Sequence, residues 1–496
     1  MQMNKNLPDK KNSGYRLNFV LGFVLFVFII LAARYQYFLL NYIEWGDESE
    51  TIVTAKMMAS GQSLYSEIFN HHGPLTFFPG VMLELFGDFG VRGHRVPTAI
   101  LQIISILAIY CSSIFKNNIT RLTSVFYATF TIIFLMPKLL GHMYTYQALT
   151  GPLLLIILFV YTFPSIIDRN LLTAPRVFTG SLLIASLPFL ASTYAPIAAI
   201  LFLISLPRSY VKASVAGAFL GTAANLLFLI CYGSLKGFLA IHFYLNYGIL
   251  PEYLDVISSA LASLSGKTDI IGPFLMFSII GLLALASHEK KMPWRSILLA
   301  IGIASLLIRG IDFHGLPYYY AFIGISLLPI LKINEFIHPV KLGALFFILL
   351  CSARASLLLP GDREELVARR IPAETEFSRL VKKYTNKDDK IIAYSFDNFQ
   401  YIAADRLPAS GHFFYLPWQE KYSENPKFGI NIDACKEIAE YRPKIMLINK
   451  WKVWGLYSWD SYGGCIQKIV DTHYTQVPDR PFYIRKDISA AETRTP

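Results

Sequence analysis

The sequence carries little charge for its length. Of its 496 residues only 16% are Asp, Glu, Lys or Arg, whereas 54% are hydrophobic. In an average soluble domain about 25% of the residues are charged. A simple soluble enzyme is therefore excluded.

Other features are scarce or missing as well. There are only five cysteines, and no Cys or His residues have the spacing of a zinc module. The sequence also lacks a glycine-rich phosphate loop of the Walker type, an internal repeat and a low-complexity segment. It thus gives no sign of a P-loop nucleotide site, a zinc finger or a repeat array.

The net charge of +11 does not point to nucleic acid as a partner. The residues from Pro360 onward hold 21 of the 45 Lys and Arg residues and 19 of the 34 acidic ones. Most of the positive excess therefore lies before Pro360, where it is spread thinly through apolar sequence without a basic patch. We expect no nucleic-acid partner.

Apolar runs dominate the first 359 residues and predict a polytopic α-helical membrane protein. A helix needs roughly 20 apolar residues to cross about 30 Å of hydrocarbon, and runs near this length predict about eleven spans. Pro188 and Pro196 favour a tight turn between the sixth span and the one before it. The expected spans are 17–38, 97–115, 122–140, 146–163, 177–192, 194–207, 213–232, 270–287, 296–309, 316–333 and 341–359.

The Lys and Arg bias of the short loops predicts a cytoplasmic N-terminus. Residues 1–16 form a basic lead without a cleavage site, so the first span is interpreted as uncleaved. An odd number of spans then places the C-terminus outside, and most acidic residues before Pro360 fall on the outer side. We expect outward-facing chemistry in a bacterial inner (plasma) membrane.

Residues 360–496 are polar and mixed, and predict a small extracytoplasmic α/β domain of about 135 residues. Cys435 and Cys465 lie in it, and an oxidising compartment would permit a disulfide between them, a pairing that the sequence leaves open. The expected strands are 390–395, 443–448 and 481–486, and the expected helices lie near 363–384, 433–441 and 463–473.

Residues 42–96 form a first outer loop that is far longer than a connector needs to be. Two adjacent carboxylates, Asp47 and Glu48, follow directly after Trp45. A short amphipathic helix is expected over 48–62, lying in the membrane interface. Next come a turn at Gly73 and Pro74 and a second apolar helix, so the carboxylates would be held at the bilayer surface.

These segments resemble the GT-C class of membrane glycosyltransferases, most closely the branch of the protein O-mannosyltransferases and the bacterial lipid A aminoarabinose transferase. The resemblance rests on an Asp-Glu pair soon after the first span, a helix leading into "GQSLY", the "HHGPL" turn and a second helix before the next span. It is most specific over Asp47 to Leu75, and "HGLPYYYAFIGISLLP" and "YIAADRLPAS" support it.

The resemblance implies an inverting transfer of a sugar from a polyprenyl-phosphate donor to a glycolipid, glycan or protein acceptor. Asp47 matches the general base of these enzymes, and Glu48 stands beside it as a second catalytic candidate. His72 falls where the donor phosphate would be bound, and His71 is a candidate ligand for a divalent metal ion.

Further candidates for binding the donor phosphate or sugar come from later loops. Tyr144 and Gln147 lie in the second outer loop, which lacks the carboxylate that relatives often carry there, so a need for metal stays open. His242 is a possible match to a donor-site histidine. Arg309 and His314 lie at the outer mouth of the ninth and tenth spans, where a basic side chain could hold a lipid phosphate.

Structural interpretations compete with these functional ones. Asp47 and Glu48 could be solvated loop charges, His71 and His72 could only anchor the turn, and Arg309 could pair with Asp312. Arg92 and Arg95 are interpreted as lipid headgroup anchors.

Two other classes of function are also open, a transporter or flippase and a polymerase or ligase of lipid-linked saccharides. A transporter would show inverted repeats and charges within the spans, which the sequence lacks. A polymerase or ligase would carry its long loop late in the chain.

Overall fold

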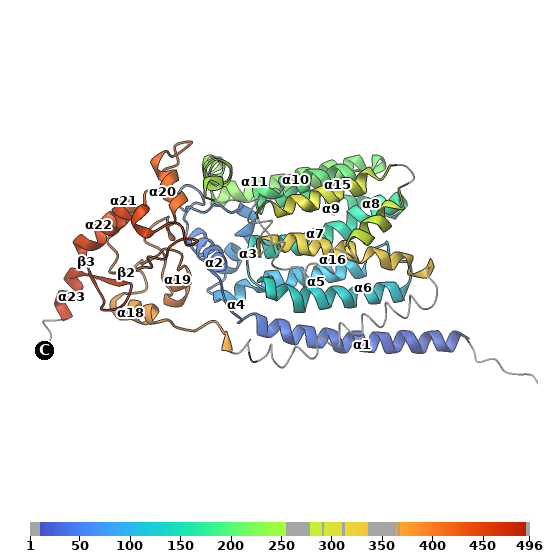
Figure 1. The fold of residues 1–496 in the computed structure, drawn as a ribbon, viewed down its shortest axis with the longest axis horizontal. Coiled ribbons are helices and arrows are strands. Elements are labelled where there is room, and N and C mark those ends of the chain that lie inside the picture. Colours follow the sequence, from blue (N-terminus) through green and yellow to red (C-terminus); the bar gives the residue numbers. More distant parts are fainter. Residues whose placement is uncertain are drawn as a thin grey trace, which may run out of the picture.

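The computed structural model describes residues 10–253, 278–289, 292–309, 313–335, 364 and 368–492. Three regions of the molecule lie one after another along its long axis (Figure 1). A bundle of long helices occupies one end, a carboxy-terminal segment with a small sheet occupies the other, and the short helices of residues 42–96 lie between them.

The bundle is built from helices whose axes run side by side (Figure 1). Each predicted span that lies wholly within the described residues contains a helix, whereas the span at 341–359 lies outside them and the one at 270–287 lies only partly inside. The bundle helices are α1 (Lys10–Leu39), α5 (Val96–Tyr110), α6 (Asn118–Phe130), α7 (Tyr146–Ile157), α8 (Phe163–Ile167), α9 (Ala174–Ser186), α10 (Ala195–Ser205), α11 (Val211–Tyr232), α15 (Trp294–Ser305) and α16 (Leu316–Ser326).

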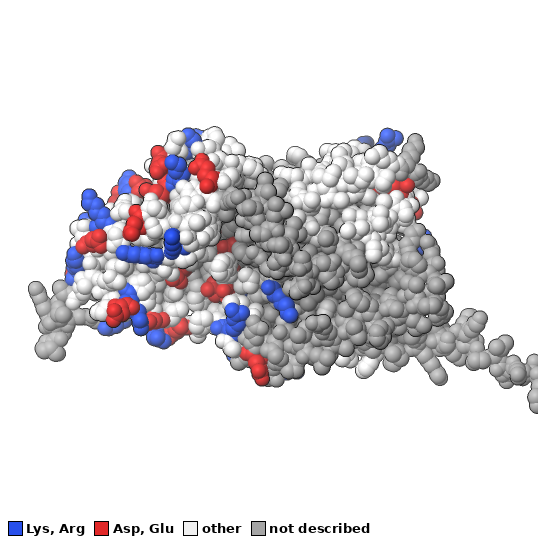
Figure 2. Space-filling model, viewed as in Figure 1, with Lys and Arg blue, Asp and Glu red and all other residues white. Residues whose placement is uncertain are grey.

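Within the described part of the chain, three helical stretches are long and apolar enough to cross a membrane. They are Gly90–Tyr110, Tyr146–Ile167 and Arg208–Tyr232. The second is mostly buried inside the bundle, while the third faces outward over most of its surface. In Figure 2 the charged side chains gather over the carboxy-terminal segment, and the described part of the bundle's flank is almost free of them.

Three short helices form the first loop: α2 (Gly46–Ala59), α3 (Phe78–Glu84) and α4 (Gly90–His94). The expectation that the first of them is an amphipathic helix lying in the membrane interface is wrong. Ala55 and Met57 face nearly opposite directions on α2, and both are fully buried. The helix is instead enclosed by protein, because the carboxy-terminal segment packs over it.

The carboxy-terminal segment contains a four-stranded sheet of order β1-β2-β4-β3. β1 and β2 are parallel, and the other two pairs are antiparallel. β1 (Ile392–Tyr394), β2 (Ile445–Ile448) and β4 (Phe482–Arg485) coincide with the segments expected as strands, and β3 (Tyr474–Gln476) was not expected. The accompanying helices are α18 (Glu376–Tyr384), α19 (Phe399–Ala404), α20 (Pro417–Glu424), α21 (Ala434–Tyr441), α22 (Gly464–His473) and α23 (Lys486–Glu492).

This segment packs directly onto the first loop. The backbone N–H of Phe69 donates to the carbonyl of Gly411 over 3.0 Å, and the Asn398 side chain donates to the carbonyl of Gly46 over 3.3 Å. A Cβ atom on Gly46 would lie only 2.0 Å from the ring of Phe396, so the start of α2 requires a glycine. The two regions also share one hydrophobic cluster.

A disulfide joins Cys435 of α21 to Cys465 of α22, with the two Cα atoms 6.1 Å apart. It closes a loop with a sequence separation of 30 residues. A cross-link of this length restricts the unfolded chain and is worth roughly 3 to 4 kcal/mol in the chain-entropy model.

We predict that Cys435→Ala lowers the unfolding free energy of the carboxy-terminal segment by about 3 kcal/mol. Thermal denaturation of the purified full chain would measure this change, with Cys231→Ala as the control because Cys231 is a free, exposed cysteine. Equal stability of both variants would contradict the prediction. Alkylation of Cys435 and Cys465 in the unreduced wild type would contradict it as well.

Candidate active site

A cavity of about 180 Å³ lies where the first loop meets the carboxy-terminal segment. The first loop supplies acidic and imidazole side chains, and His314 supplies a further imidazole. The aromatic side chains come mainly from the carboxy-terminal segment. We call this cavity the junction pocket. Its lining residues are Trp45, Asp47, Glu50, His71, His72, Leu250, His314, Phe396, Phe414, Leu416, Trp418, Trp451 and Trp454.

The first turn of α2 determines which carboxylates reach the junction pocket. Successive residues of a helix are rotated by about 100°, so Asp47 and Glu50 lie roughly 60° apart, whereas Glu48 and Glu50 face nearly opposite directions. Asp47 and Glu50 line the pocket and Glu48 does not. Acidic side chains in a first helical turn are also favoured by the helix dipole.

Glu48 is instead paired with Arg95, and both side chains are fully buried. The guanidinium donates from Nε to one carboxylate oxygen over 2.7 Å and from Nη2 to the other over 2.5 Å. Its remaining N–H groups donate to the carbonyls of Leu39, Tyr42 and Ile43. All five donors of Arg95 are therefore used, and the interpretation of this residue as a headgroup anchor is wrong.

The Glu48 carboxylate also holds the second outer loop. One of its oxygens accepts a 2.8 Å hydrogen bond from the backbone N–H of Tyr144. The hydroxyl of Tyr144 points elsewhere: it donates to the carbonyl of Thr76 over 2.6 Å and accepts from the N–H of Gly80 over 2.8 Å. Tyr144 thus links the second loop to the first and lies outside the lining of the junction pocket.

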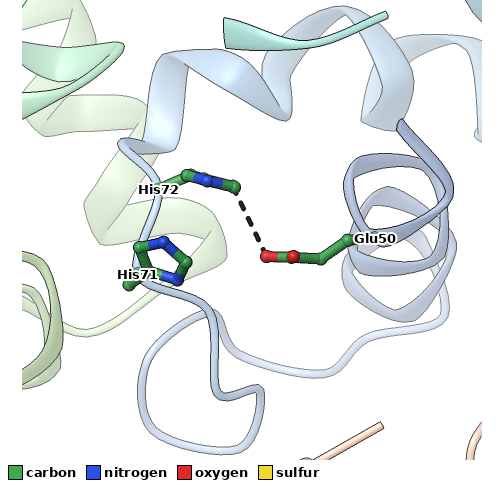
Figure 3. Close-up of side chains that lie close together, drawn as sticks. All are labelled: Glu50, His71 and His72. Atoms are coloured by element: carbon green, nitrogen blue, oxygen red, sulfur yellow. Dashed lines mark ion pairs between the residues drawn. The ribbon is translucent and has the colours of Figure 1, made fainter. Parts of the chain in front are cut away.

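Glu50, His71 and His72 form a buried cluster at the floor of the pocket (Figure 3). One ligand atom from each residue lies within 4.8 Å of the other two, and Nδ1 of His72 lies 3.4 Å from a carboxylate oxygen of Glu50. In Figure 3 the two imidazoles project from the loop toward the carboxylate on α2. Two imidazoles and one carboxylate form a common donor set for zinc and related divalent ions.

Backbone contacts on all sides fix the loop that carries the two histidines. The side-chain oxygen of Asn70 accepts a hydrogen bond from the backbone N–H of His72 over 3.0 Å. The Tyr65 hydroxyl donates to the backbone carbonyl of His72 over 2.5 Å. Asn246 and the imidazole Nδ1 of His242 both contact the carbonyl of His71, at 2.9 and 3.1 Å. Because a carbonyl only accepts, His242 donates here, and it supports His71 from behind rather than lining the pocket.

The next residue of this loop approaches the helical bundle closely. The N–H of Gly73 donates to the carbonyl of Leu190 over 3.0 Å, and a Cβ atom at Gly73 would lie 2.1 Å from the carbonyl oxygen of Phe189. Only glycine fits there, so the turn expected at Gly73 and Pro74 also fastens the histidine loop to the bundle.

The remaining sequence candidates lie on the bundle side. His314 lines the pocket, and its Nδ1 lies 2.9 Å from the side-chain nitrogen of Gln147 and 3.4 Å from the hydroxyl of Tyr146. Gln147 is thus behind His314. Arg309 ends the 3-10 turn Leu306–Arg309, and its side chain lies outside the described part of the structure.

Glu44, a half-buried residue shortly before α2, has a shifted pKa. Burial raises the pKa of Glu44 to about 7, against a hydrogen bond from the hydroxyl of Ser49 that lowers it. The neighbouring carboxylates of Glu48 and Asp397 add to the rise, and Arg95 opposes it. Glu44 is therefore less readily ionised than an ordinary glutamate.

The sequence reasoning missed two groups of pocket residues. Glu50 was overlooked because the helix expected over 48–62 was interpreted from its apolar residues alone. The helix α2 begins at Gly46, which places residues 47 and 50 on one face. Trp418, Trp451 and Trp454 also line the pocket, and no local sequence pattern connects them to Asp47.

Comparisons with known proteins agree with this architecture. ArnT from Cupriavidus metallidurans, solved bound to undecaprenyl phosphate, superposes with a TM-score of 0.54 at 9% identity, over 93% of this chain and 97% of ArnT. The apo Archaeoglobus fulgidus oligosaccharyltransferase superposes with a TM-score of 0.50 at 11% identity, over 85% of this chain and 69% of the transferase. The chain has the GT-C fold. No protein-family model and no curated protein sequence matches it.

In this GT-C chain we predict that Arg95→Ala destabilises the folded protein by about 3 to 5 kcal/mol, because it leaves the Glu48 carboxylate buried without its cation. Arg92→Ala is the matched control: Arg92 is exposed, with its guanidinium 4.8 Å from the centre of the Tyr37 ring. Thermal denaturation in lipid nanodiscs would measure both variants. Similar melting temperatures for the two would refute the structural role of the Glu48–Arg95 pair.

Proposed function

We propose that the protein is an integral-membrane glycosyltransferase that moves a sugar from a polyprenyl-phosphate donor to an acceptor at the outer face of the membrane. The observation that carries the proposal is the junction pocket, in which Asp47 and the cluster of Glu50, His71 and His72 lie together in a GT-C fold. ArnT, which has the same fold, was solved bound to undecaprenyl phosphate.

Asp47 is the proposed general base. The acceptor hydroxyl gives its proton to Asp47 while its oxygen forms a bond to the anomeric carbon of the donor. The bond between that carbon and the phosphate oxygen breaks, and its electron pair leaves with the polyprenyl phosphate. Attack from the face opposite the leaving group inverts the configuration at the anomeric carbon.

Glu48 is proposed to be a positioning residue and not the second catalytic residue that its place beside Asp47 suggested. Its carboxylate is fully buried and bonded to Arg95 and to the N–H of Tyr144, so it positions α2 rather than meeting the substrate. Tyr144 and His242 act in the same indirect way, through the loops that they hold.

The donor phosphate is proposed to lie next to His71 and His72, which face the pocket at its floor. Glu50, His71 and His72 would hold a divalent metal ion, and their donor set and spacing fit one. Such an ion would supply positive charge to the departing phosphate. His314, oriented by Gln147, is placed to contact a sugar hydroxyl, and Arg309 is a further candidate for the phosphate.

A second cavity supports a lipid-linked donor. It has a volume of about 340 Å³, and it lies among α3, α5, α7, α9 and α11 with an almost entirely apolar lining that includes Leu75, Leu190 and Phe228. Leu75 is three residues from His72, and Leu190 bonds to Gly73. An isoprenoid chain in this groove would lead its phosphate to the two histidines.

The wider architecture proposed here follows from the charge bias of the loops. About eleven helices would span a bacterial inner membrane with the N-terminus in the cytoplasm. Residues 1–359 would form the catalytic membrane domain, and residues 360–496 an extracytoplasmic α/β domain. The disulfide between Cys435 and Cys465 supports an oxidising compartment for the latter.

Asp47→Asn tests the base. We expect transfer from a radiolabelled undecaprenyl-phosphate sugar in membranes to fall by about 10² to 10⁴-fold, since the amide cannot take the proton. Asp88→Asn is the control, because Asp88 pairs with Lys56 and does not line the pocket. Activity like that of the wild type in the Asp47 variant would rule out the proposed mechanism.

Glu50→Gln tests the metal site without depending on turnover. We expect the purified full chain to bind about one zinc ion and the variant to bind it at least about 10-fold more weakly, because the carboxylate ligand is lost. Glu84→Gln is the matched control, since Glu84 lies near Lys56 and His94 and outside the cluster. Equal zinc affinity of the two variants, measured by calorimetry, would exclude the cluster as the site.

A further inference from the structure

Four tryptophans form one wall of the junction pocket: Trp45, Trp418, Trp451 and Trp454. We call them the tryptophan wall. Trp45 precedes α2, Trp418 lies in α20, and the other two lie in the loop after β2. The wall therefore combines separate parts of the chain at the carboxy-terminal side of the pocket.

Three of these indoles remain substantially exposed. The exposed fraction is 46% for Trp45, 39% for Trp451 and 44% for Trp454, whereas Trp418 is buried. Large aromatic side chains are usually removed from water, and an exposed apolar group of this size beside a cavity marks a binding surface.

The wall is held in place by stacking and by its loop. The rings of Trp418 and Trp454 are stacked, with centroids 4.9 Å apart and planes inclined by 17°. Phe396 lies between Trp45 and Trp451, with a centroid distance of 6.5 Å to each. The N–H of Val453 donates to the carbonyl of Tyr457 over 2.9 Å, which closes the turn that carries Trp454.

The polar groups of the junction pocket favour an uncharged ligand over an anionic one. Asp47 supplies a carboxylate acceptor, and no Lys or Arg is found among the described residues that line the pocket. A sugar ring has an apolar C–H face that can lie flat on an indole, and hydroxyls at its edge that can donate to carboxylates. An anionic ring at the wall would lie near the Asp47 carboxylate, and no Lys or Arg among the described lining residues would compensate its charge.

We propose that the tryptophan wall binds an uncharged sugar ring of the acceptor, which makes the acceptor a saccharide or the sugar part of a glycolipid. This inference rests on the proposed transferase function. It assigns the acceptor to the carboxy-terminal side of the pocket and leaves the donor on the side of His71 and His72, next to the apolar groove. A peptide acceptor is the alternative that the test must exclude.

The test measures binding separately from catalysis. The full chain would be placed in lipid nanodiscs without a sugar donor, so that no transfer can occur. Nanodiscs are used because many detergents have sugar headgroups. Methyl glycosides of glucose, galactose, mannose and N-acetylglucosamine would be titrated by saturation-transfer NMR, with a Ser/Thr-rich peptide alongside. We expect at least one glycoside to bind. We also expect its affinity to fall at least 10-fold in Trp451→Ala and Trp454→Ala and to be largely kept in Trp451→Tyr.

Trp294→Ala is the control, because Trp294 is 43% exposed but lies at the start of α15 outside the pocket. Tighter binding of the same sugar on an alkyl chain would identify a glycolipid, and equal binding a free glycan; both support the proposal. Binding of the peptide alone, of no glycoside, or of glycosides equally by the alanine variants would overturn it. The proposed transferase function would then still stand or fall on Asp47→Asn in the transfer assay.

Discussion

The buried ion pair between Glu48 and Arg95 determines where the reactive side chains of this chain lie. A buried pair of this kind adds little net stability compared with apolar packing, but it is costly to break and it tolerates only one geometry. Here it joins the start of α2 to the start of α5 and to the end of α1. With Glu48 directed into the protein, the rotation of α2 is fixed, and Asp47 and Glu50 are left facing the junction pocket.

The other contacts of the site extend this constraint. The histidine loop is fastened to α2 through Asn70, whose side chain donates to Thr54, and to the bundle through Gly73. The carboxy-terminal segment closes the pocket by packing Phe396 on Gly46. The buried cluster of Glu50, His71 and His72 thus lines a pocket that also has aromatic walls, and Leu75 of the apolar groove lies three residues from His72. This arrangement suits a reaction between a lipid-linked donor and a second substrate.

Much of this arrangement could be predicted where the signal is local. Apolar runs placed the bundle helices, because burial in lipid or in the bundle demands continuous apolar sequence, and short apolar runs placed β1, β2 and β4. The resemblance of the long first loop to GT-C enzymes marked Asp47, His71 and His72 as candidates for one site, and all three line the junction pocket. The predictions failed where tertiary packing determines the environment of a residue. No local sequence pattern distinguishes α2, which is buried under α19, from an interfacial helix. No local pattern shows that all the N–H donors of Arg95 form hydrogen bonds inside the protein. The tryptophan wall depends on contacts such as that between Trp45 and Phe396, which lie 351 positions apart in the chain.

The most direct test of the central claim is a cryo-electron microscopy structure of the full chain in lipid nanodiscs with undecaprenyl phosphate. The claim is that Glu48 and Arg95 orient Asp47 and Glu50 toward a donor held at His71 and His72. The expected result is phosphate density beside the two histidines, isoprenoid density in the groove lined by Leu75 and Leu190, and an intact Glu48–Arg95 pair. Phosphate bound outside the junction pocket, or Asp47 turned away from it, would contradict the claim.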